Sequence, residues 1–211
     1  SEAATLRIVR MLRRRFRRVF FRINGKNRSI MISVVVPCKP HLTILAMDSM
    51  DAPERTGEST KEADERWMRA ALLLAKAGEE RGEVPVGAVL VRNGEPIAKA
   101  FNCPIGANDP TAHAEMLALR KAGESTGNYR LTGSTLYVTL EPCPMCAGAL
   151  VHSRVARLVF GVRDLRFGGV RSKFRIADSD LLNHQVEVVE GVLAADCLAL
   201  LKGFFERARG K

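Results

Sequence analysis

The chain has 211 residues, of which 46% are hydrophobic, so it is long enough to bury a core and has the composition of a globular protein. The formal net charge is +10, but residues 1–30 hold ten positive side chains and one acid, so residues 31–211 together carry only +1. This excludes a uniformly basic nucleic-acid-binding surface and leaves only local patches for such a role. The five cysteines are scattered and odd in number, which argues against a disulfide scaffold and favours a reducing compartment.

Residues 1–60 differ from the rest of the chain. An arginine-rich run at 13–18 is followed by an apolar stretch at 29–47, which a lysine and two prolines interrupt, and then by linker-like composition. The interruptions exclude a membrane span, which needs about 20 consecutive apolar residues. We expect a disordered or mis-assigned extension, with translation starting at Met47 or Met50. An accessory RNA-binding arm and an export signal are the alternatives.

From residue 61 the pattern becomes regular and predicts one domain over 61–211. Apolar residues at helical spacing predict an amphipathic helix over 65–77. The apolar run at 84–91 predicts a buried strand, and the Asn93-Gly94 pair predicts a hairpin turn to a second strand at 96–101.

The second half of the domain alternates helices and strands. Asp109 and Pro110 predict a helix start, as an N-cap followed by proline at the first helical position, and Gly123 predicts its end. Strands are expected at 134–140, 157–162 and 186–192, and helices at 146–153 and 194–207, with a further short helix before the last strand. The alternation predicts an α/β domain with helices packed against a mixed sheet.

Cys143 and Cys146 form a CxxC pair between a predicted strand and a predicted helix, where three roles are possible. A redox dithiol is compatible with a strand-to-helix turn. A structural zinc site needs a second pair of ligands, but there is no second CxxC, and His152 and His184 lie 32 positions apart. A catalytic zinc site needs one more ligand, an open coordination position and a proton carrier nearby.

His113 and Glu115 supply these missing groups. Two helices that start at the same edge of a sheet would bring His113 to Cys143 and Cys146, and would leave the fourth tetrahedral position for water. Glu115 would then stand beside the metal as general acid and base. The combination matches the H-x-E…P-C-x-x-C signature of zinc deaminases of nucleosides and nucleobases. The sequence therefore predicts a catalytic Zn²⁺ held by His113, Cys143 and Cys146.

From about Glu65 to Arg209 the chain resembles the bacterial tRNA-specific adenosine deaminases. The likeness is carried by RWMRAALLLAKAGEERGEVPVGAVLV, NDPTAHAEMLALR, NYRL and TLYVTLEPCPMCAGALVHSR. It implies the three-layer cytidine-deaminase-like fold, in which a mixed five-stranded sheet has helices on both faces. It also implies a cytoplasmic homodimer with one Zn²⁺ per subunit, which converts adenosine to inosine at the wobble position of a tRNA anticodon stem-loop.

The resemblance also assigns roles to single residues. Glu115 would move protons from the attacking water to adenine N1 and to the departing amine. Asn102 matches an asparagine that contacts the base, and Asp164, with Arg163 and Arg166, matches a loop that contacts the anticodon nucleotides. The local positive charge would come from Arg163, Arg166, Arg171, Lys173 and Arg175, and from Arg207, Arg209 and Lys211 at the C-terminus.

Two alternative functions and two departures from the family remain. A zinc deaminase of free guanine, cytosine or cytidine would share the metal centre and differ in the pocket. A non-catalytic, zinc-containing RNA-binding subunit would have no need of Glu115. Residues 1–60 have no counterpart in the family, and Glu206 interrupts an otherwise basic C-terminal tail.

Overall fold

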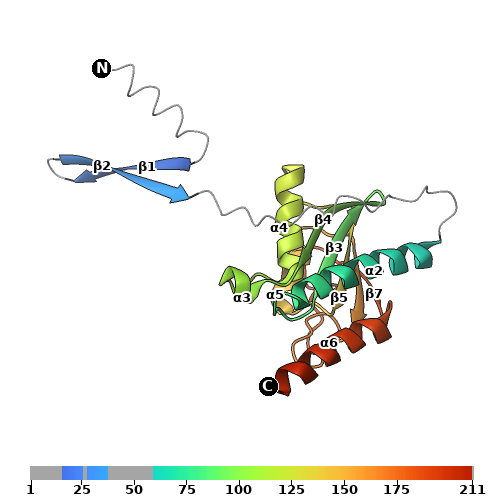
Figure 1. Cartoon of the computed structure of the whole chain (residues 1–211). Helices are drawn as coiled ribbons and strands as arrows, with labels where there is room; N and C mark the ends of the chain where they lie inside the picture. The colour runs from blue at the N-terminus through green and yellow to red at the C-terminus, as the bar shows by residue number, and fades with distance from the viewer. Residues whose placement is uncertain (1–15, 26–27, 38–58, 211) are drawn as a thin grey trace. The chain divides into compact units, whose positions relative to one another are not determined.

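The structure is a computed structural model, which describes residues 16–25, 28–37 and 59–210. The chain divides into two units, residues 1–54 and 55–211 (Figure 1). In the first unit, β1 (Phe16–Gly25) pairs with β2 (Arg28–Pro37) as an antiparallel hairpin. Most of the predicted linker lies outside the described residues, and the prediction that residues 1–60 are a disordered or mis-assigned extension stays a prediction.

The second unit is built on a mixed five-stranded sheet with the strand order β4-β3-β5-β6-β7. The central strand β5 pairs antiparallel with β3 and parallel with β6, and β7 continues the parallel side. This sheet confirms the predicted fold class. The strands are β3 (Gly87–Arg92), β4 (Glu95–Phe101), β5 (Ser134–Leu140), β6 (Arg157–Val162) and β7 (Glu187–Glu190).

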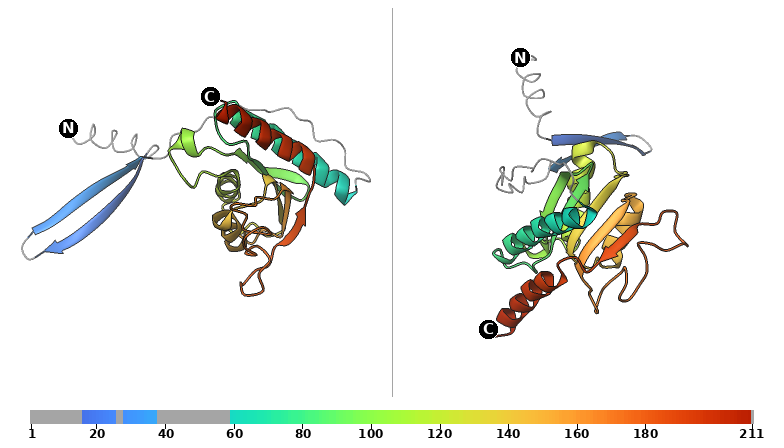
Figure 2. Two further views of the ribbon diagram at one scale, coloured as in Figure 1. Left: turned by 90° about the horizontal axis from the view of Figure 1, so that it is seen from below. Right: turned by 90° about the vertical axis from the view of Figure 1, so that its right-hand side faces the viewer.

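Helices cover both faces of this sheet (Figure 2). On one face α2 and α6 pack against alternate buried residues of the strands, such as Val89 and Val159. On the other face α4 and α5 cover the strand residues that alternate with these, such as Leu90 and Phe160. Because side chains alternate along a strand, each strand contributes to both cores. The helices are α2 (Thr60–Glu79), α3 (Pro104–Ala107), α4 (Ala114–Thr126), α5 (Pro144–His152) and α6 (Ala194–Arg209).

Helix α2 starts five residues before its predicted start at Glu65, because a capping box begins it. The Ser59 hydroxyl accepts a hydrogen bond from the Glu62 backbone N–H, and the Glu62 carboxylate accepts one from the Ser59 N–H at 2.9 Å. Further along α2, buried Asp64 accepts two hydrogen bonds from Arg157 in β6, at 2.7 and 2.8 Å, and one from the Tyr137 hydroxyl in β5 at 3.0 Å. These bonds join α2 to β5 and β6.

The predicted helix start at Asp109 and Pro110 was wrong. The Asp109 carboxylate accepts hydrogen bonds from the N–H and hydroxyl of Thr111, at 2.8 and 2.6 Å, and so closes a turn ahead of the helix. Helix α4 begins only at Ala114, with His113 as its N-cap residue. His113 therefore lies immediately before the first turn of α4 rather than inside it.

The end of α4 and the segment after β6 also differ from prediction. Helix α4 continues through Gly123 to Thr126 and ends at Gly127, whose φ of +65° is the left-handed conformation that glycine readily adopts. The segment 163–186 contains turns and no helix, so the predicted short helix was wrong. Among the described residues, no helix is long and apolar enough to cross a membrane.

Candidate functional site

The predicted zinc ligands converge where α4 and α5 begin. His113 is the N-cap residue of α4, Cys143 is the N-cap residue of α5, and Cys146 lies in the first turn of α5. The Nδ1 atom of His113 lies 3.7 Å from Cys143 Sγ and 3.6 Å from Cys146 Sγ. All three ligand atoms lie within 4.8 Å of one another.

These separations fit a tetrahedral zinc ion. Zn–S bonds of about 2.3 Å and Zn–N bonds of about 2.0–2.1 Å, at tetrahedral angles, put the sulfur and nitrogen atoms about 3.5–3.6 Å apart. The separations of 3.6 and 3.7 Å in this site agree closely with those values. One imidazole and two thiols are also a donor set that zinc prefers, and three protein ligands leave one position open.

The two thiols are electrostatically coupled. The hydrogen bond from the Cys146 side chain lowers the pKa of Cys143 to about 4, against the opposing effect of burial, and His113 adds to the lowering. The same hydrogen bond, together with burial, raises the pKa of Cys146. The Cys143 thiol therefore ionises more readily than the Cys146 thiol, and the thiolate is the form of cysteine that binds a metal ion.

Glu115 lies in the first turn of α4, two residues after His113, and its residue surface is only 3% exposed. Burial raises the pKa of Glu115 to about 7, although the nearby charge of His113 opposes the rise. A carboxyl group with this pKa can both accept and donate a proton near neutrality. Efficient general acid–base catalysis requires a group whose pKa lies near the working pH.

His113, Cys143 and Glu115 open into a pocket of about 520 Å³. Asn102 lines it, and its side-chain oxygen accepts a hydrogen bond from the Ala114 N–H at 2.8 Å, which leaves its NH₂ group as the donor available to a ligand. The remaining wall is mostly apolar, as is typical of a site for a flat ring. It is formed by Val84, Val86, Pro104, Pro110, Leu140, Glu141, Pro144, Met145, Asp164 and Phe167.

The residues predicted to contact RNA lie in two places. Asp164 lines the pocket and also an adjoining hollow of about 580 Å³. Its carboxylate accepts hydrogen bonds from the N–H groups of Arg166 and Phe167, at 2.9 and 3.1 Å, and so shapes the turn that follows. Arg163 and Arg166 line the adjoining hollow and do not line the pocket.

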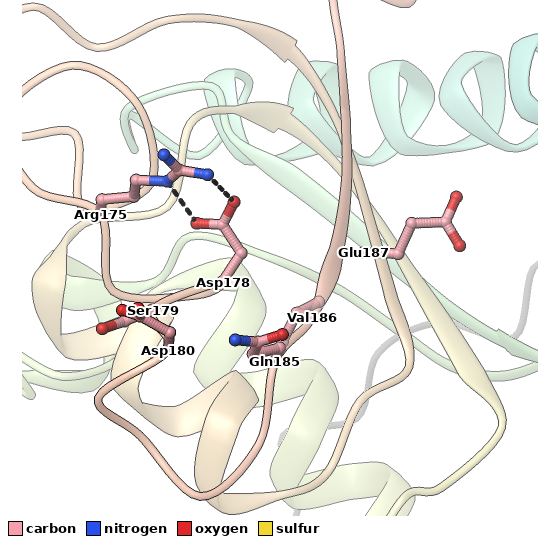
Figure 3. A pocket seen from close by; sticks show the side chains of 7 residues that line it. All are labelled: Arg175, Asp178, Ser179, Asp180, Gln185, Val186 and Glu187. Atoms are coloured by element: carbon pink, nitrogen blue, oxygen red, sulfur yellow. Dashed lines mark hydrogen bonds and ion pairs between the residues drawn. The ribbon is translucent and has the colours of Figure 1, made fainter.

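Much of the predicted positive charge of the 163–175 segment is paired with carboxylates. Arg163 donates two hydrogen bonds to Glu190, at 2.8 and 2.7 Å. Arg171 and Arg175 both form ion pairs with Asp178, at 3.0 and 3.1 Å. Figure 3 shows the Arg175–Asp178 pair on the wall of a further hollow of about 690 Å³. None of the predicted zinc ligands lines this hollow. The positive electrostatic potential of this segment is therefore weaker than its arginine content suggests.

Two buried glutamates beside the site were not predicted from the sequence. Glu83 accepts hydrogen bonds from the N–H groups of Ile105 and Gly106, at 3.3 and 2.7 Å, and so fixes α3 next to the pocket. Glu141 immediately precedes the Pro-Cys of the metal motif and is 2% exposed. A glutamate in an otherwise apolar strand end is the signal that could have identified Glu141.

Residues 61–162 match the cytidine and deoxycytidylate deaminase zinc-binding region. The tRNA-specific adenosine deaminase of Haemophilus influenzae is 52% identical over 149 residues, which are 70% of this chain and 86% of the relative. That of Bacillus subtilis is 50% identical over 148 residues, which are 70% of this chain and 92% of the relative.

Solved structures show the same likeness. One, from a study of A-to-I editing by tRNA:A34 deaminases at the wobble position, is 42% identical with a TM-score of 0.63, and the match covers 64% of this chain and 99% of that one. A guanine deaminase from Nitrosomonas europaea is 25% identical with a TM-score of 0.60, and the match covers 71% of this chain and 86% of that one.

Proposed function

The chain belongs to the family of tRNA-specific adenosine deaminases, and we propose that it hydrolyses adenosine to inosine at the wobble position of a tRNA anticodon. The observation that carries the proposal is the convergence of one imidazole and two thiols, at zinc-like separations, beside a buried glutamate. This constellation opens into a mainly apolar pocket that is large enough to receive a base.

Zinc is the cofactor of this reaction, and His113, Cys143 and Cys146 would hold one ion per chain. When bound, zinc acts as a Lewis acid that makes water a nucleophile at neutral pH. The three ligands come from two helix starts, and His113 and Cys143 line the same pocket as Asn102 and Glu115. Three protein ligands beside an open pocket support a catalytic zinc site rather than a structural one, which is usually closed by four protein ligands.

Glu115 is the proton carrier. It would accept the proton of the attacking water while the water oxygen bonds to C6 of adenine, and it would pass that proton to the ring nitrogen N1. After the second water proton reaches the amine, the C6–N bond breaks and ammonia leaves, so adenosine and water become inosine and ammonia. A pKa of about 7 suits a carboxyl group that must act first as base and then as acid.

The pocket walls would bind and orient the base. Apolar side chains such as Val86 and Phe167 offer surface to a flat ring, and the Asn102 NH₂ group would donate to one of its acceptors. Such a pocket needs a base that can leave its stack, as bases in the single-stranded anticodon loop can. The adjoining hollow, lined by Asp164 and Arg166, would receive the neighbouring nucleotides.

We extend the proposal to the assembly and location that the family implies: a cytoplasmic homodimer that binds the anticodon stem-loop of tRNA. In this proposal, residues 61–211 form the deaminase domain, and residues 1–60 are an extension outside it. The match to the deaminase region begins at residue 61, which supports this division.

Deamination of a free base is the second candidate, since a guanine deaminase shares the fold. Identities of 50–52% to tRNA-specific relatives, against 25% to this guanine deaminase, favour tRNA. A non-catalytic RNA-binding subunit is disfavoured by Glu115, because burying a carboxyl group is costly and a purely structural zinc site needs none.

The test is incubation of the zinc-loaded protein with an anticodon stem-loop that carries adenosine at the wobble position, followed by quantification of inosine. Free guanine, cytidine and adenosine are assayed in parallel. We expect inosine in the stem-loop and little turnover of the free compounds. Turnover of a free base without editing of the stem-loop would refute the proposal.

Glu115→Ala is the matched control. Because Glu115 is not among the ligands, the variant should keep its zinc and its fold but lose activity by at least about a hundredfold. Zinc analysis and circular dichroism check the first expectation, and the stem-loop assay checks the second. Substantial turnover by this variant would contradict the role of Glu115 as proton carrier.

A further inference from the structure

Glu141 lies between β5 and α5 with its carboxylate fully engaged by one loop, residues 164–172. Its Oε1 atom accepts hydrogen bonds from three consecutive backbone N–H groups at 3.1, 2.6 and 2.9 Å. Its Oε2 atom accepts one from the Asp164 N–H at 3.0 Å and one from the Ser172 hydroxyl. The three consecutive donors are Val170, Arg171 and Ser172.

The loop is packed tightly against this carboxylate and against the backbone of the metal motif. A Cβ atom at Gly168 would lie 2.4 Å from the Glu141 carboxyl group, and one at Gly169 would lie 2.8 Å from the carbonyl carbon of Cys143. The Gly169 N–H also donates to the Pro142 carbonyl at 2.8 Å. No side chain other than hydrogen fits at these two positions without displacing the loop.

The same loop forms part of the pocket wall. Asp164 and Phe167 line both the pocket and the adjoining hollow. Phe167 is 68% exposed, so few contacts of its own hold it in place. Its place depends on the turn capped by Asp164, and that turn is tied to Glu141 through the Asp164 N–H.

We infer that Glu141 is a positioning residue for RNA: it holds loop 164–172 as one wall of the pocket, so that Asp164 and Phe167 meet the nucleotides around the target base. Glu141 takes no part in proton transfer, because both oxygens already accept bonds from the loop. The inference rests on the proposed function, since it assigns the wall to RNA. The carboxylate is suited to the task because hydrogen bonds to a charged acceptor are stronger than those to a neutral one.

The test is Glu141→Gln in the full chain, with Ser172→Ala as a milder variant. Glutamine keeps the size of the side chain but removes its charge and replaces one acceptor oxygen with an NH₂ group. This group cannot accept the hydrogen bonds that the loop donates. Hydrogen exchange of the backbone amides in 164–172 should accelerate by about tenfold or more, as expected for loss of bonds to a charged group. The KM for a stem-loop should rise by about the same factor, while kcat and zinc content stay within about twofold.

Ser172→Ala removes one of the five bonds, so it should change exchange and KM in the same direction by a smaller factor. Val89→Ala is the control for lost stability alone: Val89 is buried against α2 on the opposite face of the sheet. It should lower the melting temperature without changing loop exchange or KM.

Three outcomes would overturn the inference: unchanged exchange in the loop, faster exchange with an unchanged KM, or loss of zinc with no KM effect. If Glu141→Gln does not fold, the same readouts on Ser172→Ala decide. Failure of the proposed function is distinguishable, because it would show as a wild-type protein that does not edit the stem-loop, whereas loop exchange is measured without any substrate.

Discussion

At the scale of single residues, the site depends on two N-cap residues whose side chains form no capping hydrogen bond. N-cap positions usually hold a side chain that accepts a hydrogen bond from the first helical turn. Neither His113 nor Cys143 makes such a bond, so both side chains can turn toward a metal. For α4 the missing cap is supplied from another segment, because the Asn102 side chain accepts from the Ala114 N–H. Asn102 thereby serves the helix and the pocket together.

Removing one thiol at a time should distinguish a zinc ligand from a cysteine outside the ligand set. Cys146→Ala deletes one of the three ligands and should lower zinc content, measured by atomic absorption, to less than about a tenth of wild type. Cys103→Ala is the matched control, because Cys103 is also buried beside the pocket region but lies outside the ligand set. We expect this control to keep its zinc. Equal zinc content in both variants would contradict the assigned ligand set.

At the scale of elements, α6 packs closely on β6, so their contact tolerates no added atoms. A Cβ atom at Gly161 in β6 would lie 2.4 Å from Cys197 Sγ in α6 and 2.8 Å from the Thr139 carbonyl oxygen in β5. The backbone oxygen cannot move aside easily, because β5 is the central strand of the sheet. Helix α6 also carries Phe205 and Arg209, which line the hollow beside the pocket.

Gly161→Ala should therefore lower the free energy of unfolding by about 1–3 kcal/mol, the usual cost of overpacking a core. Gly123→Ala is the opposite case: it lies inside α4, and the nearest atom to its added Cβ would be 3.7 Å away. That variant should gain about 0.5–1 kcal/mol from helix propensity. Urea unfolding of the zinc-loaded proteins measures both, and a neutral Gly161→Ala would mean that α6 can shift outward.

At the scale of the whole molecule, charge and chemistry lie in different parts of the chain. Residues 1–30 hold nine of the ten net positive charges, whereas every residue of the candidate pocket lies between 84 and 167. The deaminase unit also has its own start signal, the capping box at Ser59. These observations support a catalytic unit that does not depend on the N-terminal one.

Deleting residues 1–46 should leave kcat/KM for a stem-loop within about threefold of the full chain at physiological salt. Phosphate contacts by an arginine-rich arm would be strongest at low salt, so the assay is repeated over a range of salt concentrations. A large rise in KM at low salt that disappears at high salt would instead identify residues 1–46 as an RNA-binding arm.

The sequence by itself determined the strands of the five-stranded sheet, the candidate metal ligands and the family. Strands 134–140 and 157–162 lie as predicted, since an apolar run of that length has few alternatives to a buried strand. His113, Glu115, Cys143 and Cys146 could be selected in advance because only a few side chains bind zinc or carry protons, and their spacing follows local helix geometry.

Only the tertiary structure decided the features that depend on partners distant in sequence. The start of α4 was predicted wrongly because Asp109 closes a turn ahead of the helix, and its true first turn is capped by Asn102, twelve positions before Ala114. The pairing of Arg163 with Glu190 and the capture of loop 164–172 by Glu141 join residues 23 to 31 positions apart. Periodicity reports only near neighbours along the chain, so it carries no information about which buried carboxylate meets which backbone.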